Sequence, residues 1–193
     1  MTPDPDPLAL FDEWFREAEQ AGVEVPEAMT LATADSHGAP SARMVLLKGV
    51  DDGFVFYTGY DSRKANELDQ TGRAALVFYW RPLGKQVRVE GRVERVPEAE
   101  SAAYFATRPR GSQLAAWASH QSRPLESRDE LERRFAELER EYDGRAVPLP
   151  PHWGGFRLRP DRIEFWQHRD NRLHDRTCYT RAREGWRAET LSP

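Results

Sequence analysis

Two short segments place positively charged side chains inside stretches that otherwise have the composition of β-strands. The first is Arg43-Met44-Val45-Leu46-Leu47-Lys48, and the second is Arg172-Leu173-His174-Asp175-Arg176, which begins six residues after Trp166. A charge in an apolar strand is costly unless an opposite charge or hydrogen bonds compensate it. A phosphorylated ligand would compensate both segments, so they predict a site for an anionic small molecule.

Lysine is rare in this chain, with three lysines among 28 basic residues. Lys48 closes the first segment, Lys85 stands at a predicted strand start, and Lys64 belongs to Ser62-Arg63-Lys64 at a predicted helix start. The unpaired N–H groups of a helix N-terminus, with two cations beside them, form a phosphate site. A solvated first turn capped by Ser62 explains the same tripeptide, so the residues alone leave both interpretations open.

Strand alternation separates the two cations of the first segment. Arg43 faces one side of a regular strand and Lys48 the other. Either the ligand spans the strand edge, a bulge intervenes, or the two charges meet different parts of one site. Without a ligand, both side chains would snorkel from the strand ends.

A third group of polar side chains is spaced by four residues and then four again. Tyr104 and Arg108 share a helix face near its end, because Pro109 discourages continuation of the helix, and Ser112 is expected to cap the next helix. A phenol, a guanidinium and a hydroxyl at a helix junction would bind a phosphate. A cap and a surface arginine are the alternative.

Charge and composition exclude several classes of function. The formal net charge is −4, so the chain lacks the basic field that supports nucleic-acid binding. No apolar run is long enough for a membrane span, and Met1 to Pro7 is acidic and proline-rich rather than a targeting segment. Cys178 is the one cysteine, and the histidines show no metal-ligand spacing. We expect a soluble protein of the cytoplasm without nucleic-acid, membrane or metal partners.

The pattern of apolar residues predicts one domain over residues 1–193, with an arm and helix in 1–25 and a barrel with inserted helices in 26–193. Ser36-His37-Gly38 and Asp51-Asp52-Gly53 are hairpin signals. The predicted strands are Met29–Ala34, Ala42–Lys48, Phe54–Thr58, Ala74–Trp80, Gln86–Val96, Gly155–Arg159, Arg162–Gln167, Thr177–Arg181 and Trp186–Leu191. The predicted helices are Leu8–Ala21, Ser62–Gln70, Glu98–Thr107, Ser112–Ser119 and Arg128–Tyr142. Many short antiparallel strands with inserted helices indicate a mainly β fold, a barrel with flanking helices.

A series of short blocks, in order along the chain, resembles the pyridoxamine 5′-phosphate oxidase family from about Pro26 to the C-terminus. The blocks are Arg43 to Lys48, Phe56-Tyr57-Thr58, Ser62-Arg63-Lys64, Ser112-Gln113, Gln121-Ser122, Trp153-Gly154-Gly155-Phe156, Glu164-Phe165-Trp166-Gln167 and Arg172 to Arg176. The resemblance implies an antiparallel FMN-binding split β-barrel that acts as a homodimer, with flavin in clefts between subunits.

The resemblance also implies roles for single residues. Arg172 and His174 would be the catalytic residues over the substrate ring. Cofactor contacts would come from Arg43, Met44, Val45, Leu46, Leu47, Lys48, Tyr57, Thr58, Arg63, Lys64, Gln86, Gln121, Ser122, Trp166 and Arg176. The substrate would be bound by Lys48, Tyr104, Arg108, Ser112, Arg172 and His174. Arg43 and Lys48 would then serve two different phosphates, which addresses their opposite parity.

The activity implied is FMN-dependent oxidation of pyridoxamine 5′-phosphate and pyridoxine 5′-phosphate to pyridoxal 5′-phosphate, with O2 as electron acceptor, in vitamin B6 salvage. The alternatives are an FMN-dependent oxidase of phenazine biosynthesis, a non-catalytic flavin- or heme-binding barrel, and a pyridoxal 5′-phosphate carrier. Two features depart from the family: His168-Arg169-Asp170-Asn171 stands where the family turns through glycine, and the Arg- and Tyr-containing N-terminal extension is absent. We expect an altered loop near the substrate, and either a missing lid or a start placed too late.

Overall fold

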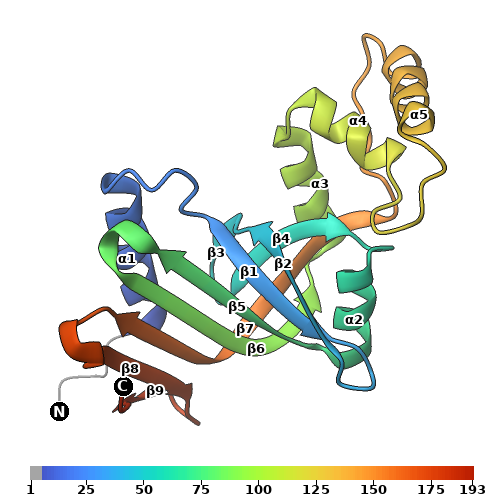
Figure 1. Ribbon diagram of the computed structural model, residues 1–193. Helices are drawn as coiled ribbons and strands as arrows, with labels where there is room; N and C mark the ends of the chain where they lie inside the picture. Colours follow the sequence, from blue (N-terminus) through green and yellow to red (C-terminus); the bar gives the residue numbers. More distant parts are fainter. Residues whose placement is uncertain (1–5) are drawn as a thin grey trace.

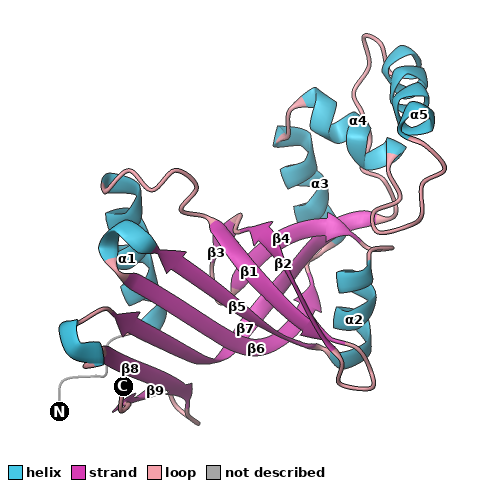
Figure 2. Cartoon of the chain, in the orientation of Figure 1, coloured by secondary structure: helices cyan, strands magenta, loops and turns pink. Residues whose placement is uncertain are grey.

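The computed structural model describes residues 6–193, and its centre is a nine-stranded antiparallel sheet (Figures 1 and 2). The first part of the predicted N-terminal arm, residues 1–5, lies outside the described residues. The strands are β1 (Ala28–Ala34), β2 (Pro40–Leu46), β3 (Gly49–Val50), β4 (Phe54–Gly59), β5 (Arg73–Trp80), β6 (Lys85–Arg95), β7 (Trp153–Gln167), β8 (Asp175–Arg181) and β9 (Trp186–Thr190). The helices are α1 (Pro7–Gln20), α2 (Arg63–Thr71), α3 (Glu98–Thr107), α4 (Arg110–Ala118) and α5 (Arg128–Glu141), with short 3-10 turns at Arg81–Leu83 and Asp170–Arg172.

The sheet curls into a half-barrel, in agreement with the predicted split barrel. Its order is β2-β1-β5-β6-β7-β4-β3, with β8 and β9 added beside β7. The Lys48 N–H, between β2 and β3, donates to the carbonyl of Val55 in β4 at 2.8 Å, which extends the β3–β4 hairpin toward the end of β2. The predicted turns at Ser36–Gly38 and Asp51–Gly53 join β1 to β2 and β3 to β4.

One strand organises both ends of the sheet. β7 pairs along one edge with β6, while β4 and β8 share its other edge, at the beginning and the end of the strand. The prediction of two strands here, Gly155–Arg159 and Arg162–Gln167, is wrong. Pro160 does not break β7 because it lies opposite Gly91 at a register shift in β6, where a β-carbon on Gly91 would lie 2.0 Å from the Arg159 carbonyl oxygen.

Helix boundaries follow their capping residues. Asp6 caps α1 through the Leu8 N–H, and Ser62 caps α2 by accepting from the Ala65 N–H. The prediction that Ser112 caps a helix is wrong: α4 begins at Arg110 after Pro109, so Ser112 lies inside its first turn. The first charged segment is also shorter as a strand than predicted, because β2 ends at Leu46.

Two clusters of apolar side chains hold these elements together. The larger fills the curled sheet and is closed by α1, whose Phe11 packs against Phe54 and Phe78 at ring separations of 4.9 and 5.0 Å. The smaller contains Phe105, Leu114, Val147 and Trp153, under α3, α4 and α5 at one end of the sheet (Figure 1). Among residues 6–193, no helix is long and apolar enough to cross a membrane.

Candidate active site

A cavity of about 450 Å³ lies between the end of β2, β4, α2, α3 and α4. Its lining includes many of the predicted ligand-binding residues: Met44, Val45, Leu46, Lys48, Tyr57, Thr58, Lys64, Tyr104, Arg108, Ser112 and Gln121. Lys48, Lys64 and Arg108 make the lining cationic, and no aspartate or glutamate is among the described residues that line it. Three cations without a carboxylate make this cavity suited to an anion.

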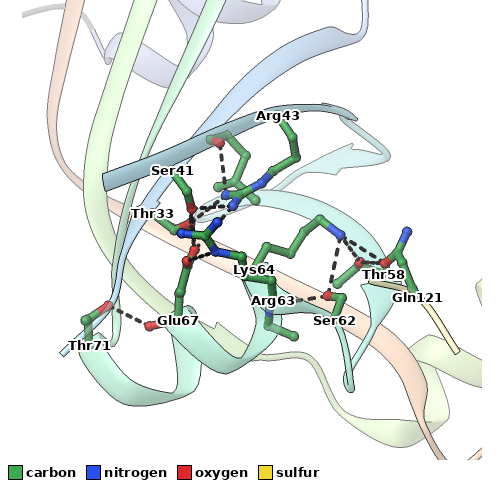
Figure 3. A network of polar contacts seen from close by, with 12 residues as sticks. Thr33, Ser41, Arg43, Thr58, Ser62, Arg63, Lys64, Glu67, Thr71 and Gln121 are labelled. Carbon is green, nitrogen blue, oxygen red and sulfur yellow. Dashed lines mark hydrogen bonds and ion pairs between the residues drawn. The ribbon is translucent and has the colours of Figure 1, made fainter. Parts of the chain in front are cut away.

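Lys64 is the most enclosed of the three cations, with 7% of its surface exposed. Its ammonium donates to Thr58 Oγ1 at 3.0 Å, to Gln121 Oε1 at 2.9 Å and more weakly to Ser62 Oγ at 3.4 Å (Figure 3). All three are neutral acceptors. Burial, and to a smaller extent the charge of Arg43, lower the pKa of Lys64 to about 8.

Arg43 lies beside this cavity rather than in its lining. Its terminal nitrogens donate to Thr33 Oγ1 and Ser41 Oγ, each at 2.5 Å, and one of them reaches Glu67 Oε2 at 3.2 Å. Arg63, one residue before Lys64, donates from Nε to Glu67 Oε1 at 2.7 Å (Figure 3). Arg63 and Ser122 line a neighbouring, smaller hollow. Lys48 lies two residues beyond the end of β2, so the prediction that Arg43 and Lys48 face opposite sides of one regular strand does not apply. Arg43 contacts Glu67 of α2, while Lys48 lines the cavity.

Aromatic side chains form one wall of the cavity. The ring of Tyr57 stacks on Tyr104 at 4.0 Å and on Trp153 at 5.4 Å, and the guanidinium of Arg108 lies over Trp153 at 4.6 Å. Burial raises the pKa of Tyr57 to about 12 and also raises that of Tyr104, so both phenols keep their protons at neutral pH. Among residues 6–193, Arg108 Nη1 is the buried side-chain nitrogen without a hydrogen-bond partner, which marks a place for an absent acceptor.

A second group of predicted residues lies at the other end of the sheet. Gln86, Trp166 and Arg176 form one cross-strand row over β6, β7 and β8. From Trp153 to Trp166 the path along β7 spans roughly 40 Å, and Figure 1 shows β8 far from α3 and α4. None of Gln86, Trp166, Arg172, His174 or Arg176 lines the cavity within the described chain. Leu47, also predicted to contact the cofactor, is buried in the main core.

Comparisons with known proteins identify the family of this chain. Residues 15–142 match the family described as "Pyridoxamine 5′-phosphate oxidase", and residues 153–193 match its "Pyridoxine 5′-phosphate oxidase C-terminal dimerisation region". This chain belongs to the pyridoxamine 5′-phosphate oxidase family. Proteins named pyridoxine/pyridoxamine 5′-phosphate oxidase from Rubrobacter xylanophilus and Myxococcus xanthus are 63% and 57% identical to it, over 98% of this chain and 88% and 92% of theirs.

Solved structures of the pyridoxamine 5′-phosphate oxidase type share the fold. PhzG from Burkholderia lata 383, in complex with tetrahydrophenazine-1-carboxylic acid, is 37% identical with a TM-score of 0.94, over 100% of this chain and 95% of that one. A pyridoxamine 5′-phosphate oxidase-related, FMN-binding protein from Nostoc punctiforme has a TM-score of 0.78 at 16% identity, over 100% of both chains. The predicted split barrel is thereby confirmed.

The loop in which this family member carries His168 to Asn171 is ordered by local contacts. The Arg169 N–H donates to His174 Nδ1 at 3.1 Å, and the His174 ring lies 4.5 Å from Trp166 and 5.2 Å from His168. Because Nδ1 accepts this hydrogen bond, a neutral His174 carries its proton on Nε2. Asn171 and Arg172 have φ values of 56° and 63°, a left-handed conformation that costs free energy in residues other than glycine.

Sequence reasoning missed two buried carboxylates in this oxidase-family chain. Glu67 and Glu164 are each 3% exposed. Glu67 contacts Arg43 and Arg63, while Glu164 Oε1 accepts from Arg176 Nε at 2.9 Å and Oε2 lies 3.4 Å from Arg88 Nη1. A signal existed for Glu67, because its i,i+4 spacing from Arg63 predicts a pair.

Proposed function

We propose that this chain catalyses the FMN-dependent oxidation of pyridoxamine 5′-phosphate and pyridoxine 5′-phosphate to pyridoxal 5′-phosphate. The observation that carries the proposal is the cavity in which Lys48, Lys64 and Arg108 converge without a carboxylate. The names of relatives that are 57% and 63% identical support the same activity. O2 accepts the electrons and becomes hydrogen peroxide, and the amine substrate consumes water and releases ammonia.

The cavity is suited to the phosphate groups of two molecules, because its cations fall into two groups. Lys64, Thr58 and Gln121 form one group at the start of α2, where a buried ammonium has neutral partners. Lys48, Tyr104, Arg108 and Ser112 form the other, which includes the unpartnered Arg108 Nη1. We assign the FMN phosphate to the first group and the substrate phosphate to the second, since each would compensate a desolvated cation.

A homodimer would complete the site. Gln86, Trp166 and Arg176 for the flavin, and Arg172 and His174 for the substrate, lie at the opposite end of β7 from the cavity. A second copy could place its own end of β7 over the cavity of the first. The match of residues 153–193 to a dimerisation region supports this arrangement.

The protein's part in the reaction is to position the substrate and to exclude water from the site. The bound flavin supplies the acceptor for the hydride that leaves the substrate carbon. Lys48, Arg108, Tyr104 and Ser112 hold the substrate phosphate, which fixes the distance of the reacting carbon from that anchor. Arg172 and His174 of a second copy cover the pyridine ring. His174 can donate from Nε2 while the Arg169 N–H occupies Nδ1.

An anaerobic visible spectrum tests the proposed function directly. The protein loaded with FMN should lose its flavin absorption when pyridoxamine 5′-phosphate is added without oxygen, and regain it with hydrogen peroxide when oxygen is admitted. A flavin band that persists would point to another substrate, such as the tricyclic ligand of the PhzG neighbour. Failure to bind FMN would contradict the flavoenzyme.

The cytoplasm is the compartment that we propose for this reaction. Cys178 is a free thiol that is 3% exposed. A chain with one unpaired cysteine is suited to a reducing compartment. Fractionation of the source cells, with peroxide formation assayed in each fraction, would test this location.

A further inference from the structure

Glu67 is a buried carboxylate that accepts hydrogen bonds from four side chains. It projects from α2 toward β1 and β2 (Figure 3). Oε2 accepts from Thr33 Oγ1 at 2.5 Å, Ser41 Oγ at 2.6 Å and Arg43 Nη2 at 3.2 Å, while Oε1 accepts from Arg63 Nε. Burial alone would raise the pKa of Glu67, but these four hydrogen bonds outweigh it and lower the pKa to about 2. Glu67 is therefore a carboxylate at every pH at which the protein works.

A carboxylate only accepts hydrogen bonds, and this fixes the direction of its neighbours. Because Thr33 and Ser41 each donate their one hydroxyl proton to Glu67, their oxygens are left to accept from Arg43. Arg43 Nη1 also donates to the Leu31 carbonyl at 3.3 Å. Both terminal nitrogens of Arg43 are thus held through Glu67, directly or through a hydroxyl.

Arg63 is held differently. Glu67 engages only its Nε, and the Arg63 side chain is 63% exposed. Within residues 6–193, its terminal nitrogens have no acceptor, so they are free to bind a ligand. Lys64 turns the opposite way, toward Thr58 and Gln121, and makes no contact with Glu67 (Figure 3).

We propose that Glu67 is a positioning residue for the phosphate of the flavin, which it serves by holding Arg43 and Arg63 beside the Lys64 ammonium. This inference rests on the proposed FMN site. Arg43, Arg63 and Lys64 carry three positive charges and Glu67 one negative charge, which leaves a net charge of +2. A phosphate monoester carries about −1.5 to −2 at neutral pH. Glu67 therefore matches the charge of the site to a phosphate dianion while it fixes the cations.

Glu67→Gln tests the proposal through affinity for two flavins. An amide nitrogen in place of one oxygen would donate, and so could not accept from Arg63 or from the hydroxyls. We expect the Kd of FMN, measured by quenching of flavin fluorescence in protein stripped of flavin, to rise about tenfold. The Kd of riboflavin, which lacks the phosphate, should change less than about twofold. A loss of folding alone would weaken both flavins together.

Asp69→Asn is the matched control. Asp69 lies on the same helix and pairs with an arginine, Arg95, at 2.6 Å, but this pair is exposed, and neither residue is among the described residues that line the cavity. The same change of charge there should leave both Kd values unchanged. If Asp69→Asn weakens FMN as much as Glu67→Gln does, the effect is general electrostatics and the proposal is wrong.

A second variant keeps the proposal testable if Glu67→Gln does not fold. Ser41→Ala removes one hydroxyl between Glu67 and Arg43 and should raise the Kd of FMN about threefold with riboflavin unchanged. Unchanged or tighter FMN binding by a folded Glu67→Gln, or by Ser41→Ala where the former does not fold, would overturn the positioning role alone. Wild-type protein that binds riboflavin and FMN equally would overturn the phosphate site and with it the proposal.

Discussion

Two buried carboxylates each hold arginine side chains, one beside the cavity and one at the far end of β7. At the cavity end, Glu67 holds arginines beside the buried Lys64; at the far end, Glu164 holds Arg176. Lys64 at the cavity end is 7% exposed and is held by three neutral acceptors, whereas Arg172 at the far end is exposed and Leu173 beside it is 68% exposed. Under the proposed function, one chain supplies the phosphate sites, and a second chain supplies the residues that cover the rings.

Mixed dimers would give the largest effect. Arg108→Ala alters the cavity end and Arg172→Ala the far end, and each alone should lose at least about tenfold in kcat/KM. When the two variants are unfolded and refolded together, a mixed dimer has one site with neither change. Random pairing should then restore about a quarter of the wild-type sites.

The control for mixed dimers uses two changes at one end. Arg108→Ala mixed with Lys48→Ala should regain nothing, because every site keeps an altered cavity. Activity that stays low in the first mixture, despite dimers of both variants, would show that one chain supplies both groups of residues.

Loss of Lys64 should weaken FMN binding, whereas loss of Arg172 at the far end should not. Lys64→Ala removes the buried ammonium from the residues assigned to the FMN phosphate, so the Kd of FMN should rise about 30- to 100-fold. Arg172→Ala should change this Kd less than about threefold while it lowers kcat. Fluorescence titration and turnover at saturating FMN measure the two quantities. Equal loss of flavin in both variants would contradict the division between cofactor and substrate residues.

The pH dependence of FMN affinity should come from Lys64, at the cavity end. With a pKa of about 8 in the free protein, Lys64 loses its charge above pH 8, and a bound phosphate favours the charged form. The Kd of FMN should therefore be nearly flat from about pH 6.5 to 7.5 and rise about fivefold between pH 8 and 9. In Lys64→Arg the guanidinium keeps its proton, so the rise should vanish. A wild-type curve that is flat to pH 9 would exclude Lys64 as the titrating group.

The smallest effect is expected from the carboxylate of the far end. Glu164→Gln weakens the hold on Arg176, which is also fixed by a hydrogen bond from Nη1 to the Ser192 carbonyl at 2.8 Å. The Kd of FMN and that of riboflavin should both rise about threefold, because Arg176 is assigned to the flavin away from its phosphate. A rise in the Kd of FMN alone would show that Arg176 contacts the phosphate of the flavin instead.

The sequence predicted the strands and turns better than it predicted which site residues lie close together in the fold. Hairpin signals at Ser36–Gly38 and Asp51–Gly53 are local, and the structure confirms them. Pro160 misled the prediction because its tolerance depends on Gly91 in another strand. Of the partners of Glu67, only Arg63 is close enough in the sequence to be predicted, because the others lie on β1 and β2. The partners of Glu164 lie on the neighbouring strands β6 and β8, so they depend on the pairing of the sheet. That Trp166 and Lys64 lie far apart within one chain follows only from the path of β7.

The cations of the cavity that lack a carboxylate partner destabilise the protein when no anion is bound. Lys64 and Arg108 are partly or wholly removed from water without a carboxylate, so they lower the free energy of unfolding until an anion arrives. A bound flavin adds stability according to its concentration relative to its Kd. In a cell, chains without flavin would unfold more often and be degraded first. The supply of cofactor would therefore set how many copies of this protein persist, as well as how fast each one works.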